Sequence, residues 1–324
     1  MGRSVQDILD RQGFLVLDGG LATALESAGH VLDTPLWSAG VLLEAPEAVR
    51  SAHAAFLEAG ADCISTASYQ ASLPGFARVG VGPDEGARLL RLSVGLAAEA
   101  SAAFWADPKN RRSRCRPLVA ASVGPYGAFL ADGSEYDGRY GVGPDALAAF
   151  HRPRLEILVD TAADLLAVET IPSLQEAEVL VALLSALDHP GAWISFTCRD
   201  DETLWDGTAV EDAARACSGE AGVVAVGVNC TEPAHVAGLL RRIRKVTDLP
   251  LLAYPNSGEA YDAGTRAWIT REPASAWLDR VPGWTDAGAS LIGGCCRVGP
   301  DLIRGIRRHL ESTTKAKREG ERAV

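Results

Sequence analysis

Two apolar runs of the chain end in cysteines, and together they offer three thiol groups. Leu291-Ile292 leads into Gly293-Gly294-Cys295-Cys296, and a run far upstream ends in Gly227-Val228-Asn229-Cys230. Neighbouring side chains on a regular strand point to opposite faces, so adjacent cysteines can reach one ion only where the strand breaks, which paired glycines permit. Zinc favours tetrahedral thiolate coordination, and a catalytic zinc typically keeps one position for water or substrate. Three cysteines without an obvious fourth ligand therefore predict a catalytic metal site.

The other cysteines and the histidines lack the spacing of metal ligands. Cys63, Cys115, Cys198 and Cys217 fall in predicted strands, a loop or a helix, where small buried thiols are common. An odd total of seven cysteines in a long chain, without an apolar signal segment at its start, predicts reduced thiols and a cytoplasmic location.

Charge and hydropathy exclude two classes of partner. The net charge of -11 argues against nucleic acid, because phosphate binding requires a concentrated basic surface. No charge-free apolar run reaches about 18 residues, so we expect no membrane span. We expect small-molecule partners instead.

Eight short apolar runs alternate with segments of helical character to the end of the chain. They are nearly continuous in hydrophobicity, as expected for parallel strands that are covered on both faces. The predicted strands are Phe14 to Asp18, Cys63 to Ser68, Leu118 to Val123, Leu165 to Glu169, Trp193 to Thr197, Val223 to Asn229, Leu251 to Tyr254 and Ser290 to Gly293.

The helical segments between them carry start and stop signals. One begins at Pro46-Glu47 and ends before Ala59-Gly60. The others are predicted over residues 83–103, 144–162, 173–187, 209–218, 232–246, 272–278 and 300–310. Eight strand and helix pairs predict an α/β fold of the (β/α)8 TIM barrel type; a doubly wound open sheet is the main competitor. We expect one domain over residues 1–312, followed by a charged, disordered tail over 313–324.

Polar residues gather where the predicted strands end, which is where a barrel has its active site. These candidate substrate-binding residues are Asp18, Gly19, Gly20, Thr66, Ser68, Tyr69, Gln70, Glu169, Asn229, Asn256 and Ser257.

Each candidate has a functional and a structural interpretation. Asp18-Gly19-Gly20 could bind an ammonium or a carboxylate, or form a capped turn; its position on the same rim as the cysteines favours the ligand. Glu169 requires a partner if it is buried, and a substrate ammonium, an arginine or a backbone N–H would each serve. Tyr69 could face a cationic sulfonium or quaternary ammonium, or simply pack. Asn229 could hold its loop or bind substrate, and Asn256 with Ser257 could bind an amino-acid end or stabilise the bend after Pro255.

The polar segment Tyr126 to Gly143 is too long for a simple turn. It is predicted either as a lid or pocket wall, or as a passive insertion.

These motifs together resemble the homocysteine S-methyltransferase family, which includes the first module of cobalamin-dependent methionine synthase and the body of betaine-homocysteine methyltransferase. The resemblance runs from about Phe14 to Leu310. Its most specific part is the Gly-Gly-Cys-Cys motif with the upstream cysteine, whereas Asp-Gly-Gly alone is weak. The supporting motifs are Thr66-Ala67-Ser68-Tyr69-Gln70, Glu169-Thr170-Ile171-Pro172 and Tyr254-Pro255-Asn256-Ser257-Gly258.

The resemblance implies one Zn²⁺ per chain, bound by Cys230, Cys295 and Cys296, with the homocysteine sulfur at the open position. It places the amino-acid end of homocysteine near Asp18, Gly19, Gly20 and Glu169. The absence of corrinoid and folate modules, and of the betaine enzyme's C-terminal extension, points to the compact subgroup that uses S-methylmethionine and can accept S-adenosylmethionine. The implied product is methionine.

Three alternatives to this function stay open at this point. The donor could be betaine, and the acceptor could be another thiol or a selenol. A zinc- or thiol-responsive redox sensor, in which the Cys295-Cys296 pair is oxidised, is the alternative that is not an enzyme; it would not require polar residues around the rim.

Overall fold

The chain folds into a closed barrel of eight parallel strands. The computed structural model describes residues 4–32, 36, 38–262, 267–269 and 274–322. The strands follow the order β1-β10-β7-β6-β5-β4-β3-β2, and a parallel bridge between Leu17 and Cys63 joins the last strand to the first. This closure confirms the predicted TIM barrel and excludes the open sheet. The barrel strands are β1 (Leu15–Val16), β2 (Cys63–Ser65), β3 (Leu118–Val123), β4 (Leu165–Ile171), β5 (Ala192–Phe196), β6 (Val223–Asn229), β7 (Leu251–Tyr254) and β10 (Ala289–Ile292).

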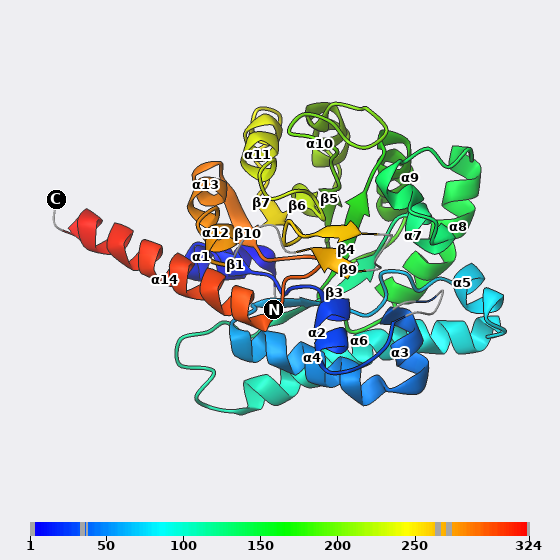
Figure 1. The fold of residues 1–324 in the computed structure, drawn as a ribbon, viewed down its shortest axis with the longest axis horizontal. Coiled ribbons are helices and arrows are strands. Elements are labelled where there is room, and N and C mark those ends of the chain that lie inside the picture. Colours follow the sequence, from blue (N-terminus) through cyan, green and yellow to red (C-terminus); the bar gives the residue numbers. More distant parts are fainter. Residues whose placement is uncertain (1–3, 33–35, 37, 263–266, 270–273, 323–324) are drawn as a thin grey trace.

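Helices surround the strands as an outer layer (Figure 1). The larger helices are α4 (Pro46–Ala59), α6 (Pro83–Ala106), α8 (Pro144–Val159), α9 (Leu174–Ser185), α10 (Val210–Ser218), α11 (Val236–Arg244) and α14 (Pro300–Arg322). Shorter elements are α1 (Val5–Gln12), α2 (Leu21–Ser27), α3 (Ser38–Glu44), α5 (Leu73–Arg78), α7 (Tyr126–Leu130), the 3-10 helix η1 (Ser134–Tyr136), α12 (Ala274–Leu278) and α13 (Val281–Asp286). Strands β8 (Ala260–Asp262) and β9 (Ala267–Ile269) form a separate antiparallel pair.

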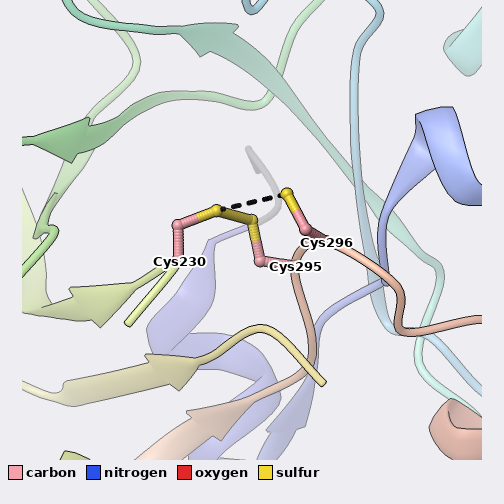
Figure 2. Close-up of side chains that lie close together, drawn as sticks. All are labelled: Cys230, Cys295 and Cys296. Atoms are coloured by element: carbon pink, nitrogen blue, oxygen red, sulfur yellow. Dashed lines mark hydrogen bonds between the residues drawn. A yellow bond between two sulfur atoms is a disulfide. The ribbon is translucent and has the colours of Figure 1, made fainter. Parts of the chain in front are cut away.

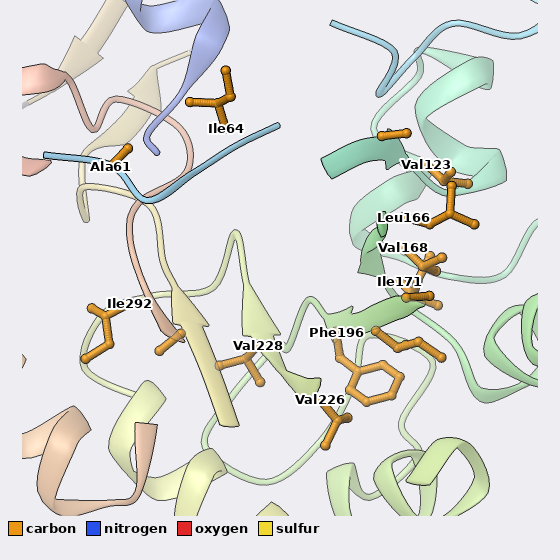
Figure 3. Packing of buried hydrophobic residues seen from close by; sticks show 14 of the residues in the cluster. Ala61, Ile64, Val123, Leu166, Val168, Ile171, Phe196, Val226, Val228 and Ile292 are labelled. Carbon is orange, nitrogen blue, oxygen red and sulfur yellow. The ribbon is translucent and has the colours of Figure 1, made fainter. Parts of the chain in front are cut away.

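Successive side chains of each strand point to opposite faces, and they form two buried layers. Leu166 and Val168 of β4, and Val226 and Val228 of β6, belong to the layer between the strands and the helices (Figure 3). The residues between them face the barrel interior, and burying each large aliphatic side chain contributes about 1.5–3 kcal/mol. The interior cluster contains Leu15, Leu17, Cys63, Leu118, Ala120, Leu165, Ala167, Trp193, Ala225, Leu252, Tyr254 and Leu291.

Helix α1, which the sequence analysis did not predict, packs on the barrel interior. Val5 and Ile8 belong to the interior cluster. Ser4 and Asp7 form a capping box at the start of the helix, and Gly13 ends it in the left-handed conformation. The helix therefore covers the interior residues at the amino ends of the strands, away from the polar rim.

The C-terminal residues differ from the expectation for a disordered tail over 313–324. Helix α14 continues to Arg322, and Figure 1 shows its end projecting away from the barrel. Its first turns are anchored, because Arg307 Nη1 lies 2.6 Å from Oδ2 of the fully buried Asp62. The following lysines, arginines and glutamates have high helix propensity, which allows the helix to continue without a core beneath it. The first two residues of the helix predicted over 272–278 lie outside the described residues.

Helix α6 is the one described helix that is long and apolar enough, by length and composition, to cross a membrane. It packs against α4, α8 and β3, and Leu89, Leu90 and Val94 are almost fully buried there. This packing is typical of a helix in the outer layer of a barrel.

Candidate metal centre and substrate cavity

Three cysteine side chains converge at the carboxyl ends of β6 and β10 (Figure 2). Their sulfur atoms all lie within 4.8 Å of one another. A disulfide joins Cys230 to Cys295, and the sulfur atoms of Cys230 and Cys296 are 3.7 Å apart. The prediction that two adjacent cysteines and a third from 65 residues upstream meet at one point is thus confirmed.

The adjacent cysteines share one site because β10 ends before them. The strand stops at Ile292, and a Cβ atom on Gly294 would lie 2.1 Å from the Val298 side chain, so only glycine fits there. Beyond the strand, the Cys295 N–H donates to Pro255 O at 2.8 Å. On the other side of the site, Cys230 has a φ of 46°, in the left-handed region that costs a non-glycine residue about 1–3 kcal/mol. Strained backbone of this kind is common at functional sites.

The cysteine cluster fits a thiolate-bound metal. Tetrahedral zinc with Zn–S bonds of about 2.3 Å implies sulfur atoms about 3.8 Å apart, close to the Cys230 to Cys296 separation. Burial, with the Glu135 charge as a second cause, raises the pKa of the Cys296 thiol to about 12. A bound metal cation would lower the pKa of this thiol instead, because metal coordination deprotonates a thiol. All three ligands are available only when the disulfide is reduced.

A cavity of about 340 Å³ opens beside the cysteines. Nine of the residues predicted from sequence line it: Asp18, Gly19, Gly20, Thr66, Tyr69, Glu169, Cys230, Cys295 and Cys296. The polar rim and the cysteine cluster therefore form one site.

Two buried carboxylates face this cavity without a basic partner among the described residues. Asp18 accepts hydrogen bonds from Ser65 N at 2.7 Å and Ser65 Oγ at 3.3 Å, and the Ser122 hydroxyl donates to Glu169. Burial raises the pKa of Asp18 well above its usual range, and the Glu169 charge raises it further, whereas the Ser65 hydrogen bonds lower it. Burial also raises the pKa of Glu169 to about 7. Two close carboxylates whose ionisation is disfavoured by burial suit a ligand that carries an ammonium group.

Five predicted substrate-binding residues are not among those that line the cavity. Ser68 donates to Ser122 O, and Gln70 donates to Ala128 O. Asn256 Oδ1 accepts from Gly258 N, and Ser257 Oγ accepts from Glu259 N. Asn229 bonds to Thr170 and Ser195, which supports the interpretation that it holds its loop.

The Gly20 N–H is also engaged within the protein, because it donates to Val298 O at 3.0 Å.

Sequence reasoning missed several lining residues. Ser65 and Ser122 lie on strands β2 and β3, where a small polar residue in an apolar run gave a weak signal. Tyr254, at the end of β7, was noted as a strand end but not as a site residue; its hydroxyl lies 2.6 Å from Ser195 Oγ. Glu135 and Tyr136 belong to the segment whose role was left open.

That segment, residues 126–143, forms part of the cavity wall. It contains α7 and η1, and the Tyr136 ring packs against Trp205 with centroids 5.9 Å apart. Tyr140 Oη donates to Glu176 Oε2 at 2.9 Å, and Tyr126 N donates to Glu176 Oε1 at 2.6 Å. Both ends of the segment are thus tied to one buried carboxylate of α9, which favours a fixed wall over a passive insertion.

Comparison with known proteins identifies a family whose reaction agrees with the site described above. The family profile described as "Homocysteine S-methyltransferase" matches residues 15–310, from β1 into α14. The chain belongs to the homocysteine S-methyltransferase family. It is therefore a member of a methyltransferase family, and the predicted resemblance is confirmed.

Two named relatives are similar in sequence to this protein over nearly the whole chain. Homocysteine S-methyltransferase YbgG of Bacillus subtilis is 45% identical over 93% of this chain and 96% of its own length. Selenocysteine Se-methyltransferase of Brassica oleracea is 43% identical over 95% of this chain and 92% of its own length.

A solved relative shares the fold and contains a metal. The metallated form of the homocysteine methyltransferase MmuM from Escherichia coli superposes with a TM-score of 0.85 at 44% identity, over 94% of this chain and 99% of that one. An oxidised form of the same protein superposes equally well. At least one relative thus takes up a metal, which, together with the cysteine cluster, supports the expectation of a metal cofactor here.

Proposed function

We propose that this protein transfers a methyl group from a sulfonium donor to the sulfur of L-homocysteine and so forms methionine. The observation that supports this best is the shared cavity, in which the three cysteine sulfurs and the carboxylates of Asp18 and Glu169 face one space. Homocysteine has a thiol at one end and an ammonium at the other, so it matches both halves of the cavity. Family membership supports the same reaction.

The metal in this proposal is one Zn²⁺ bound by Cys230, Cys295 and Cys296. When bound, it would lower the pKa of a coordinated substrate thiol from about 8.5 and so keep a nucleophilic thiolate at neutral pH. Cys230, Cys295 and Cys296 would hold the ion and leave it able to bind that sulfur as a further ligand.

The chain's own residues orient the substrate. Asp18 and Glu169 bind the homocysteine ammonium, and Ser65 and Ser122 hold these carboxylates by hydrogen bonds to their oxygens. Tyr254 lines the same cavity. Its hydroxyl is hydrogen-bonded to Ser195 Oγ and accepts a hydrogen bond from Trp193 Nε1 at 3.1 Å. The homocysteine sulfur then attacks the donor methyl carbon in line: a new S–C bond forms, the donor S–C bond breaks, and its electron pair returns to the donor sulfur. The donor leaves as a neutral thioether, and this step requires no general base.

S-methylmethionine is the donor that we favour, with S-adenosylmethionine as a second sulfonium donor. The Tyr69 ring on the cavity wall suits either cation. A selenol acceptor is a second candidate, because the selenocysteine Se-methyltransferase of Brassica oleracea is 43% identical to this chain.

We also propose that residues 1–312 form the catalytic domain, which the family match over 15–310 supports. A cytoplasmic location would suit the site, since reducing conditions keep the three cysteines available as ligands.

Methionine formation tests the proposed function directly. Reduced, zinc-loaded protein and homocysteine are incubated separately with S-methylmethionine, S-adenosylmethionine, betaine and methyl-folate. Methionine should form with the sulfonium donors and not with betaine or methyl-folate. Selenohomocysteine and cysteine, offered in place of homocysteine, define the acceptor range. No methyl transfer to homocysteine from any donor would overturn the proposal.

A further inference from the structure

The cavity has more carboxyl groups than one substrate ammonium accounts for. Four carboxylates line it: Asp18, Glu26, Glu135 and Glu169. Of the described residues that line the cavity, only Arg297 is basic, and its guanidinium lies 3.5 Å from Glu26 and 2.8 Å from Glu259. Asp18 and Glu169 serve the homocysteine ammonium, so the carboxylate of Glu135 is left over.

Glu135 differs from an ordinary surface glutamate. It is partly buried, it lines the cavity together with Cys296, and no described residue forms a hydrogen bond or ion pair with its carboxylate. A carboxylate that lines the cavity without a partner among the described residues is available to a cation that arrives with a ligand.

The backbone around Glu135 is held in place. A Cβ atom on Gly127 would lie 2.4 Å from Glu135 N, so the absence of a side chain there allows η1 to lie directly on α7. Aromatic residues line the same cavity, Tyr136 from η1 and Tyr69 from beyond β2. Anion and aromatic faces together suit a soft cation such as a sulfonium, which cannot donate hydrogen bonds from its sulfur.

We propose, on the basis of the function proposed above, that Glu135 is the residue that selects a cationic donor, by placing its carboxylate against the sulfonium while Asp18 and Glu169 bind the homocysteine ammonium. The sulfonium loses its positive charge as the methyl group leaves. Glu135 therefore stabilises the bound donor more than the transition state, and it acts on donor affinity rather than on the chemical step.

Calorimetric titration with two matched ligands tests this role. S-methylmethionine and homoleucine have the same amino-acid end and nearly the same shape, but homoleucine has a CH group in place of the sulfonium sulfur. Glu135→Gln should weaken S-methylmethionine binding by roughly tenfold or more and change homoleucine binding by less than about twofold. The matched control is Asp137→Asn, which removes the same charge from an exposed position of the same segment and should leave both affinities unchanged.

Steady-state kinetics give the second measurement. Glu135→Gln should raise KM for S-methylmethionine without lowering kcat, and leave KM for homocysteine close to the wild-type value. Equal weakening of both ligands would mean that Glu135 binds the ammonium, and unchanged S-methylmethionine affinity would mean that it binds no part of the donor; either result overturns the assignment. A wild-type protein that forms no methionine from S-methylmethionine or S-adenosylmethionine would instead refute the proposed function, so the two failures are distinguishable.

Discussion

The side-chain amide of Asn229 forms two hydrogen bonds with Thr170: it accepts from the Thr170 backbone N–H and donates to the Thr170 hydroxyl, both at 2.7 Å. Asn229 directly precedes Cys230, and Thr170 directly follows Glu169. This pair therefore joins the end of β6 to the end of β4 and sets the position of a cysteine ligand relative to the carboxylate proposed to bind the ammonium.

We expect Asn229→Ala to lower the free energy of unfolding by about 1–3 kcal/mol, because it leaves buried groups of Thr170 without partners. It should also raise KM for homocysteine and weaken zinc binding, because the Asn229–Thr170 pair positions both Glu169 and Cys230. Urea denaturation, kinetics and metal analysis measure the three effects. Ser195→Ala is the comparison: it removes one hydrogen bond to Asn229 and one to Tyr254 but leaves both bonds to Thr170, so it should weaken zinc binding less. Normal zinc affinity and KM in Asn229→Ala would contradict the coupling.

Alanine substitution of each clustered cysteine tests the metal site. Cys230→Ala, Cys295→Ala and Cys296→Ala should each lose nearly all bound zinc and reduce activity by roughly 100-fold or more, without unfolding the barrel. Metal analysis and circular dichroism provide the measurements. Cys115→Ala is the matched control, because this cysteine is free, buried and outside the cluster. Retained zinc and turnover in one of the three variants would remove that residue from the ligand set.

Oxidation should switch off metal binding, because the disulfide between Cys230 and Cys295 uses two of the three proposed ligands. We expect oxidised, denatured protein to show the five free thiols of the structure, and reduced protein all seven. Only the reduced protein should bind zinc and transfer methyl groups. The sensor hypothesis paired Cys295 with Cys296, whereas the structure pairs Cys295 with Cys230. Zinc binding that survives complete oxidation would show that other residues bind the metal.

The barrel could be predicted from the sequence because its signals are local. Apolar runs such as Leu118 to Val123 and Val223 to Asn229 match β3 and β6 residue for residue. The proline at the start of α4 and the glycine after its end marked that helix almost to the residue. The convergence of the cysteines followed once the strands were counted, since the carboxyl ends of parallel barrel strands share one rim.

The inner wall of the cavity could not be predicted in the same way. Ser65 and Ser122 interrupt apolar strands as single small residues, and their role depends on Asp18 and Glu169 from other strands. Glu135 lines the cavity from η1, which packs directly on α7 within the same segment, and the segment's polar sequence did not indicate that packing. Gln70 and Ser257 lie near strand ends but are not among the residues that line the cavity, and their side chains bond to the protein's own backbone.

Homocysteine binding should depend on pH through Glu169, whose pKa burial raises to about 7 while hydrogen bonds from Ser122 and Tyr254 lower it. A substrate ammonium prefers the ionised carboxylate, so affinity should increase as pH rises from about 6 to 8 and then level off. Asp18, whose pKa burial also raises, contributes in the same direction. Homoserine is the probe, because it keeps the amino-acid end and has no thiol that titrates. We expect Glu169→Gln to weaken homoserine binding at pH 8 by roughly tenfold and to reduce its pH dependence. Calorimetry at several pH values measures this, and an equal slope in both proteins would show that Glu169 does not bind the ammonium.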